Sequence, residues 1–313
     1  RLAEIIADRN PQKIAINSSK LTAYADGMTL SAHEEMMAAL PAALRSRVVR
    51  DEVLAIRWLE TRTPSEMARY PEIVALAHAI IGEGLSGKVI RPGITTTDDV
   101  AWWFRERIAE LGVEAWFHPS VAISRKGVQE QLDGDTVIEQ GDMLWTDFGI
   151  TYLRLNTDTQ QNAYVLRDGE TQAPKGLRDG LAASNRVQDA LTSSFTAGDS
   201  GNDILVRARD KAIAQGLEPS IYSHPIGYHG HGAGAAIGFW DDQNPGPRGE
   251  HSLYPHTAWS IELSATMEVP EWGRQKISFK TEEDAFFDGK TVQYIDGRQK
   301  EFYLIGGAPE ASE

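Results

Sequence analysis

The sequence predicts an α+β fold with a small first part and a large second part, and three observations support this. The length of 313 residues suits about two domains. Helical patterns occur in two pairs, and strand-like segments follow each pair. A content of 41% hydrophobic and 24% charged residues is typical of a globular chain with a real core rather than of a disordered one.

The first part, residues 1–62, has the pattern of an incomplete α/β unit. Residues 13–17 predict a short buried strand, and residues 53–56 predict another. Residues 31–44 predict a helix that Ser31 caps, with Glu34 at the capping-box position. Because these elements are too few for a whole domain, we expect them to be the tail of a truncated N-terminal domain.

The second part, residues 63–313, is expected to contain one architecture twice. Thr63 and Pro64 mark a helix start, and this helix is expected to end near residue 84. No sequence repeat is strong enough to prove the two-fold relation, which is therefore expected in the architecture alone. The other elements are expected at residues 97–111, 175–192 and 202–215 for helices and at residues 115–123, 142–166, 274–287 and 292–304 for strands.

Composition excludes several kinds of function. The formal net charge of −14 argues against a nucleic-acid partner, because phosphate binding requires clustered Lys and Arg. The absence of cysteine excludes disulfides, thiolate metal sites and cysteine nucleophiles, so any metal must have oxygen and imidazole ligands. No apolar run approaches the roughly 18 residues of a membrane span. The chain opens at Arg1, and a cytoplasmic or periplasmic location stays open, with export weakly favoured by the lack of cysteine.

Two aspartates stand in strand-like surroundings. Asp147 lies among apolar residues, and Asp158 follows it eleven residues later. If the chain turns near Tyr152 and Leu153, the two aspartates lie opposite each other on paired strands, about 5 Å apart at Cβ. A bridging cation would turn the repulsion between them into attraction. The alternative is a pair of unrelated aspartates near a loop.

A glycine-rich segment contains His224, His229 and His231. Glycines flank His231 on both sides, so its imidazole can approach a metal closely. A dinucleotide-binding loop is a weak alternative, because the glycines are not spaced as that motif requires. A lone histidine is more often structural, whereas three histidines within eight residues favour a metal ligand.

Two further segments contain acids beside apolar residues. Glu262 stands between apolar neighbours, and Glu282 opens a run of three acids that leads into an aromatic strand. At least one of the three must point inward if that strand is half-buried, and a buried carboxylate needs a partner that neutralises it. The alternative is that all three acids are solvated at the strand end.

Together, two aspartates, one histidine and two glutamates resemble the metal ligands of the pita-bread metallohydrolases. This family includes methionine aminopeptidase, aminopeptidase P, prolidase and their metal-free relative creatinase. The resemblance covers about residues 64–304 and implies the pita-bread fold. It rests on Asp147 in Asp-x-Gly with Gly149, Asp158, His231 in Gly-His-Gly-x-Gly, Glu262 after Ser260 and Ile261, and Glu282 before an apolar triplet that begins at Ala285.

The first part resembles the tail of the extra domain that aminopeptidase P, prolidase and creatinase possess and that methionine aminopeptidases generally lack. This likeness favours proline-directed enzymes. Because pita-bread enzymes with the extra domain often pair, it also implies a homodimer.

The sequence departs from the family pattern on the substrate side. The family has a second histidine seven residues after the ligand, and counting from His231 this place holds Gly238. Leu263 follows Glu262 where Pro-Gly is usual. The family's upstream substrate-contacting histidine has no clear match: Glu130 or Gln131 falls near its place, and His118 is a further candidate.

The resemblance implies two divalent ions, with Mn first and Zn, Co or Fe as alternatives, and a bridging water that attacks the scissile carbonyl. By resemblance, Asp147 would chelate one ion, Asp158 and Glu282 would bridge the pair, and His231 and Glu262 would complete the second ion. Glu262 would also accept the proton of the water as general base.

His224 or His229 is expected to donate a proton to the oxyanion or to the leaving nitrogen. The expected substrate is a peptide from which the residue before a proline is removed. A prolidase restricted to dipeptides and a non-catalytic binding module on the same fold are the alternatives.

Overall fold

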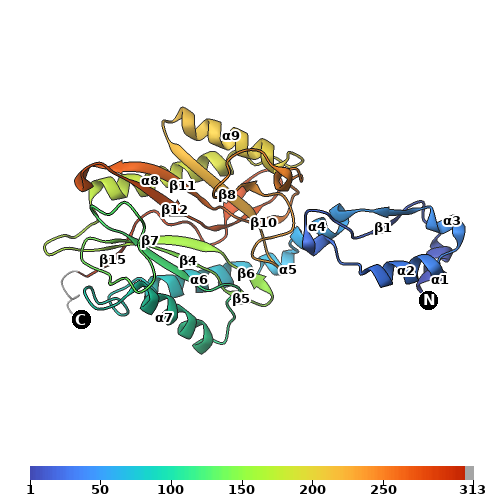
Figure 1. Cartoon of the computed structure of the whole chain (residues 1–313), viewed down its shortest axis with the longest axis horizontal. Helices are drawn as coiled ribbons and strands as arrows, with labels where there is room; N and C mark the ends of the chain where they lie inside the picture. The colour runs from blue at the N-terminus through green and yellow to red at the C-terminus, as the bar shows by residue number, and fades with distance from the viewer. Residues whose placement is uncertain (307–313) are drawn as a thin grey trace.

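The computed structural model describes residues 1–306 and shows an N-terminal arm that projects from a layered body (Figure 1). The arm, drawn in blue, is residues 1–62 and has the N-terminus near its free end. Its elements are α1 (Leu2–Arg9), β1 (Ile14–Ile16), η1 (Ala23–Ala25), α2 (Leu30–Ala39), α3 (Ala42–Arg45), β2 (Val48–Arg50) and α4 (Glu52–Glu60).

The arm confirms one predicted strand and corrects two other predictions. β1 forms as expected and pairs in parallel with β2. The predicted helix at residues 31–44 is two helices, since Pro41 lacks the N–H that a continuous helix requires, and its cap is Thr29 rather than Ser31. The predicted strand at residues 53–56 is wrong, because Asp51 accepts a hydrogen bond from the Val53 N–H (3.1 Å) and starts helix α4.

The body has an α+β architecture in two halves, as predicted. Its first half contains α5 (Pro64–Met67), α6 (Tyr70–Gly84), α7 (Thr97–Glu110), β3 (Ser120–Ser124), β4 (Met143–Phe148), β5 (Thr151–Tyr152), β6 (Leu155–Asn156) and β7 (Thr159–Val165). Its second half contains α8 (Lys175–Thr192), α9 (Gly201–Ala214), β8 (Glu218–Ile226), β9 (Ile237–Gly238), η2 (Pro247–Gly249), β10 (Thr257–Ser260), β11 (Leu263–Val269), η3 (Pro270–Trp272), β12 (Gln275–Thr281), β13 (Asp284–Phe287), β14 (Val292–Tyr294) and β15 (Tyr303–Ile305).

Helix starts in the body follow the expected capping chemistry. Thr63 caps α5 in a capping box with Glu66, and Thr96 caps α7 in one with Asp99. Amphipathic faces then pack the helices onto the sheets. In Figure 1, α6 and α7 lie below β4, α9 lies at the top of the body, and α8 lies beside β11. Among residues 1–306, no helix is both long enough and apolar enough to span a bilayer.

Two sheets form the centre of the body. One sheet has the order β15-β7-β4-β3, and the other has the order β12-β11-β8-β10-β13-β14 with β9 beside β8. The strand predicted at residues 292–304 is in fact two strands, of which β14 joins the larger sheet and β15 joins the smaller one. Gln160 and Glu282 exchange backbone hydrogen bonds of 3.0 and 3.1 Å, which join the two sheets. The candidate site lies at this junction.

Candidate metal centre

Four acids and one buried histidine converge where the two sheets meet. Ligand atoms lie within 4.8 Å of one another in three overlapping groups. The groups are Asp147, Asp158 and Glu282; His224, Glu262 and Glu282; and Asp158, His224 and His231.

The two aspartates meet, although not as directly opposed residues. In the register of β4 and β7, Asp147 lies opposite Gln160 rather than opposite Asp158. The connection contains its own small hairpin, β5–β6, whose turn residues Leu153 and Arg154 have positive φ values of 51° and 67°. Asp158 therefore follows this hairpin immediately before β7, two residues along the chain from Gln160 and on the same face.

His224 is the histidine in closest contact with the acids. Its Nε2 lies 3.7 Å from Asp158 Oδ2, 3.8 Å from Glu262 Oε2 and 3.7 Å from Glu282 Oε1. Its Nδ1 lies 3.1 Å from the Pro225 carbonyl, whereas Nε2 has no hydrogen-bond partner within residues 1–306. A buried ring nitrogen directed at three carboxylates without a hydrogen bond is the arrangement of a metal ligand.

The other two histidines lie farther from the acids. His231 is exposed, shares a group with only one acid, and has its ring centroid 4.5 Å from that of His224. His229 belongs to none of the three groups and stacks on Tyr24 of the arm, with ring centroids 3.7 Å apart. The structure thus brings His224, rather than His229, to the acids.

Electrostatics in the centre favour a bound cation. Burial, followed by the charges of the neighbouring carboxylates, raises the pKa values of Asp147, Asp158 and Glu262 well above their usual range. Burial raises the pKa of Glu282 as well. Burial lowers the pKa of His224 to about 4, so its imidazole is neutral near pH 7, which is the form that binds metals.

The donor set fits divalent ions. Carboxylate oxygens and one neutral imidazole suit hard or borderline cations such as Mn, Zn, Co and Fe. Besides His224 Nε2, the buried Asp147 Oδ1 has no hydrogen-bond partner within residues 1–306. Cations would supply the missing partners and relieve the repulsion among the acids.

All three acids of the run at Glu282 are buried, so the alternative of three solvated acids is wrong. Glu283 lies 2.9 Å from His78 Nε2 and accepts a hydrogen bond from the Gln299 N–H (2.8 Å). Asp284 accepts hydrogen bonds from the Asp158 N–H (3.3 Å). These two acids therefore brace the segment on which Glu282 lies.

Two clefts open beside the centre. The acid-side cleft has a volume of about 410 Å³. It is lined by Trp145, Asp147, Gln160, Ser220, Tyr222, Trp240, Glu262, Leu263, Ser264, Thr266, Ser278 and Lys280. The histidine-side cleft, of about 200 Å³, is lined by His224, His231 and Arg248 and by arm residues that include Tyr24. The arm thus forms part of the wall beside the histidines.

Gln160 and Lys280 also lie at the centre, although no motif in the sequence indicated them. Gln160 Nε2 donates to Glu262 Oε1 (2.9 Å) and Glu282 Oε2 (2.6 Å), and its Oε1 accepts from Trp145 Nε1 (2.9 Å). Gln160 follows Asp158 by two residues and Lys280 precedes Glu282 by two. Because side chains two apart on a strand share a face, this spacing was the available signal.

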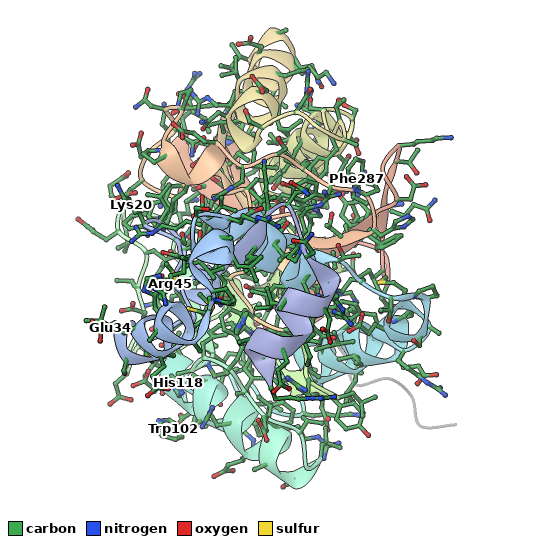
Figure 2. All side chains as sticks on the ribbon, turned by 90° about the vertical axis from the view of Figure 1, so that its right-hand side faces the viewer. Lys20, Glu34, Arg45, Trp102, His118 and Phe287 are labelled. Atoms are coloured by element: carbon green, nitrogen blue, oxygen red, sulfur yellow. The ribbon has the colours of Figure 1, made fainter. Side chains whose placement is uncertain are left out.

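The candidates for the upstream histidine lie apart from the metal-ligand groups. His118 is exposed and packs against Trp102, with ring centroids 5.2 Å apart; both side chains are labelled in Figure 2. Gln131 accepts a hydrogen bond from Lys280 Nζ (3.0 Å) and so lies at the edge of the acid-side cleft. Neither Glu130 nor His118 lines that cleft.

Fold and site together define a class of protein, a metal-dependent hydrolase with α+β architecture. The model of metallopeptidase family M24 matches residues 66–286. The chain belongs to this family and has its pita-bread fold. No curated protein matches the chain.

Solved structures show the same fold at low sequence identity. The X-Pro aminopeptidase from Thermotoga maritima has a TM-score of 0.65 and 16% identity, with 97% of this chain and 78% of that chain covered. The Xaa-Pro dipeptidase from Bacillus anthracis has a TM-score of 0.62 and 19% identity, with 97% and 77% covered. The methionine aminopeptidase from Thermotoga maritima has a TM-score of 0.55 and 18% identity, with 76% and 99% covered.

Proposed function

We propose that this chain is a two-metal aminopeptidase that hydrolyses the bond between an N-terminal residue and a following proline. The convergence of four carboxylates and one imidazole supports the hydrolytic centre. The proline preference has support from structures named X-Pro aminopeptidase and Xaa-Pro dipeptidase, which cover 97% of the chain, arm included. The structure named methionine aminopeptidase covers only 76% of it.

The metal ligands that we propose are Asp147, Asp158, His224, Glu262 and Glu282. Here His224 takes the place that the resemblance first implied for His231, because its Nε2 lies within 3.8 Å of three acids. Sequence spacing supports the exchange. His231 follows His224 by seven residues, which is the family spacing between the ligand and the second histidine.

The remaining polar groups have roles that follow from their positions. When bound, two divalent ions supply electrophilic activation of the scissile carbonyl and of water. Glu262 accepts the proton of the attacking water and passes it toward the leaving nitrogen. Gln160 holds the carboxylates of Glu262 and Glu282 in place, and the Ser260 hydroxyl donates to Glu282. His231, exposed beside the centre, donates a hydrogen bond from its neutral ring N–H to the developing oxyanion.

The variant Glu262→Gln tests the catalytic assignment. The amide keeps the size of the side chain but cannot accept the proton, so we expect retained metal and a loss of at least about 100-fold in kcat. Metal content is measured by elemental analysis, and turnover is measured on Xaa-Pro-Xaa peptides with each candidate metal. Unchanged turnover would reject Glu262 as the base.

A prolidase is the second candidate, and the structure named Xaa-Pro dipeptidase supports it. Release rates from Xaa-Pro dipeptides and from Xaa-Pro-Xaa tripeptides separate the two candidates. Faster cleavage of tripeptides supports the aminopeptidase, and cleavage confined to dipeptides supports the prolidase.

A further inference from the structure

A row of polar side chains on neighbouring strands lines the acid-side cleft, starting beside the candidate metal centre. Ser264 on β11 lies opposite Ser220 on β8 and opposite Lys280 on β12. Thr266 lies opposite Ser278 in the same ladder. Directly opposed residues of antiparallel strands share a face, and all five side chains line the cleft.

The row continues the alternation that begins at the metal-centre acids. Glu262, Ser264 and Thr266 are spaced by two residues, as are Glu282, Lys280 and Ser278. Each step of two residues advances about 7 Å along a strand. The Cα of Lys280 therefore lies about 7 Å along the strand from that of Glu282. At this distance its side chain can reach a group of the substrate that lies one residue away from the scissile bond.

Lys280 is a half-buried cation in the wall of this cleft. Its Nζ donates to Gln131 Oε1 (3.0 Å) and lies 4.4 Å from the centroid of the Trp145 ring. Within residues 1–306 it forms no ion pair with a carboxylate. Burial lowers the pKa of Lys280, and the charges of Asp147 and Glu262 oppose that shift. Among the residues that line this cleft, Lys280 is the one Lys or Arg.

Four hydroxyl side chains lie in the cleft with Lys280. Within residues 1–306, the side chains of Ser220, Ser264, Thr266 and Ser278 form no hydrogen bond, although they line the cleft. An ammonium next to free hydroxyls is suited to a carboxylate, because charge-assisted hydrogen bonds are stronger than neutral ones. The rings of Trp145, Tyr222 and Trp240 line the same cleft and suit the apolar part of a ligand.

We propose that Lys280, with the hydroxyls of Ser264 and Ser220, forms a subsite for a carboxylate of the peptide substrate. This inference rests on the proposed function insofar as it takes the ligand to be a peptide. The carboxylate has two sources, the C-terminus of a dipeptide or an acidic side chain beside the scissile bond. Either carboxylate can lie about 7 Å from the metal centre, which is the advance of two residues along a strand.

Two pairs of peptides distinguish these sources. Leu-Pro and its C-terminal amide differ only in the terminal carboxylate, whereas the amides of Glu-Pro and Gln-Pro differ only in the side chain. In one of the two pairs, we expect the metal-loaded protein to favour the charged peptide by roughly 10- to 100-fold in kcat/KM. The pair that shows the preference identifies the carboxylate.

Three variants test whether Lys280 is responsible. Lys280→Met keeps the length of the side chain and removes the charge, so the ratio of kcat/KM between the charged and the uncharged peptide of the responsive pair should fall to about one. Lys280→Arg should keep most of the preference. Lys276→Met is the matched control, since Lys276 lies on the same strand but is exposed and pairs with Glu218 (3.2 Å) outside the cleft.

Calorimetry of peptide binding to the metal-loaded Glu262→Gln variant separates this inference from the proposed function. The four peptides are titrated into this variant with and without Lys280→Met. Binding that favours the charged peptide and depends on Lys280 supports the subsite even if no peptide is hydrolysed. Hydrolysis or binding without a charge preference, or a preference that Lys280→Met retains, overturns the subsite and leaves the peptidase intact. Equal losses on all four peptides in Lys280→Met also overturn it, because Lys280 would then support the metal centre instead.

Discussion

His224 places a neutral imidazole against three carboxylates, and this position is the reason for proposing different roles for His224 and His231. Its glycine-poor neighbourhood, with Pro225 and Ile226 following, is that of a strand, whereas His231 lies in a loop. A strand holds a side chain in one direction more firmly than a loop does, which suits a ligand. An exposed loop residue can adjust to a substrate instead.

Substitution of the two histidines is expected to have different effects. His224→Ala should weaken metal binding by more than the roughly 10- to 100-fold typical of an outer residue, because it removes a ligand. His231→Ala should weaken metal binding by no more than roughly 10- to 100-fold. It should lower kcat by about 100-fold, because it removes a hydrogen-bond donor to the oxyanion. Metal titration calorimetry and steady-state kinetics measure the two effects. The reverse pattern would restore His231 as the ligand.

At the scale of elements, the strand segment that contains Glu282 is tied to helix α6. His78 on α6 contacts both Glu283 (2.9 Å) and Asp296 (2.8 Å). Burial opposes the charged imidazole, but hydrogen bonds to these two carboxylates and their charges outweigh it and raise the pKa of His78 to about 9. The ion pairs of His78 with Glu283 and Asp296 therefore clamp helix α6 of the first half to the segment that follows Glu282. We call this contact the His78 clamp.

This clamp predicts a pH dependence of stability. Because the pKa of His78 is raised in the folded state, its contribution is complete below pH 6.5 and is lost as the pH rises through 9, with about 3 kcal/mol as an upper value. His78→Gln should remove this pH-dependent part. Urea unfolding of metal-loaded protein at pH 6.5 and 9 measures it, with the exposed His118→Gln as the control. Equal pH slopes in His78→Gln and in the unsubstituted protein would contradict the clamp.

At the scale of the whole molecule, the candidate metal centre draws its residues from both halves of the body. Asp147 and Asp158 come from the first half, whereas His224, Glu262 and Glu282 come from the second. The backbone pairing of Gln160 with Glu282 is a direct contact between the two sheets at this junction. Bound cations would therefore cross-link the two halves of the body in addition to their role in catalysis.

Metal binding is expected to stabilise the whole chain. At a free ion concentration about 100-fold above Kd, the free energy of unfolding should rise by about 2.7 kcal/mol per site, since the ions bind the folded state. Thermal unfolding with Mn, Zn, Co or Fe, followed by addition of a chelator, measures this effect. The same titration of His224→Ala is the control and should show a smaller gain. A melting temperature that no metal changes would contradict a shared cation site.

The boundary between the arm and the body near residue 62 stays a prediction, as does the homodimer. Arm residues contact the body at several points, including the stacking of Tyr24 on His229 and the bridge between Thr61 and Thr257. The arm thus contributes to the wall of the site, whatever its independence as a folding unit.

The sequence by itself determined the residue types of the centre, the family resemblance and most helices, because capping residues and helical periodicity are local signals. The prediction of a helix at residues 175–192 coincides with α8. Local signals failed at α4, where a short apolar run suits a strand or a helix equally and the Asp51 cap was decisive.

Only the tertiary structure decided which histidine meets the acids, that Asp147 pairs with Gln160, and that Glu282, Glu283 and Asp284 are all buried. These facts depend on strand register and on the junction of two sheets, which bring together residues more than 100 positions apart. Strand register is set by contacts across the whole body, and no local pattern in the chain specifies it.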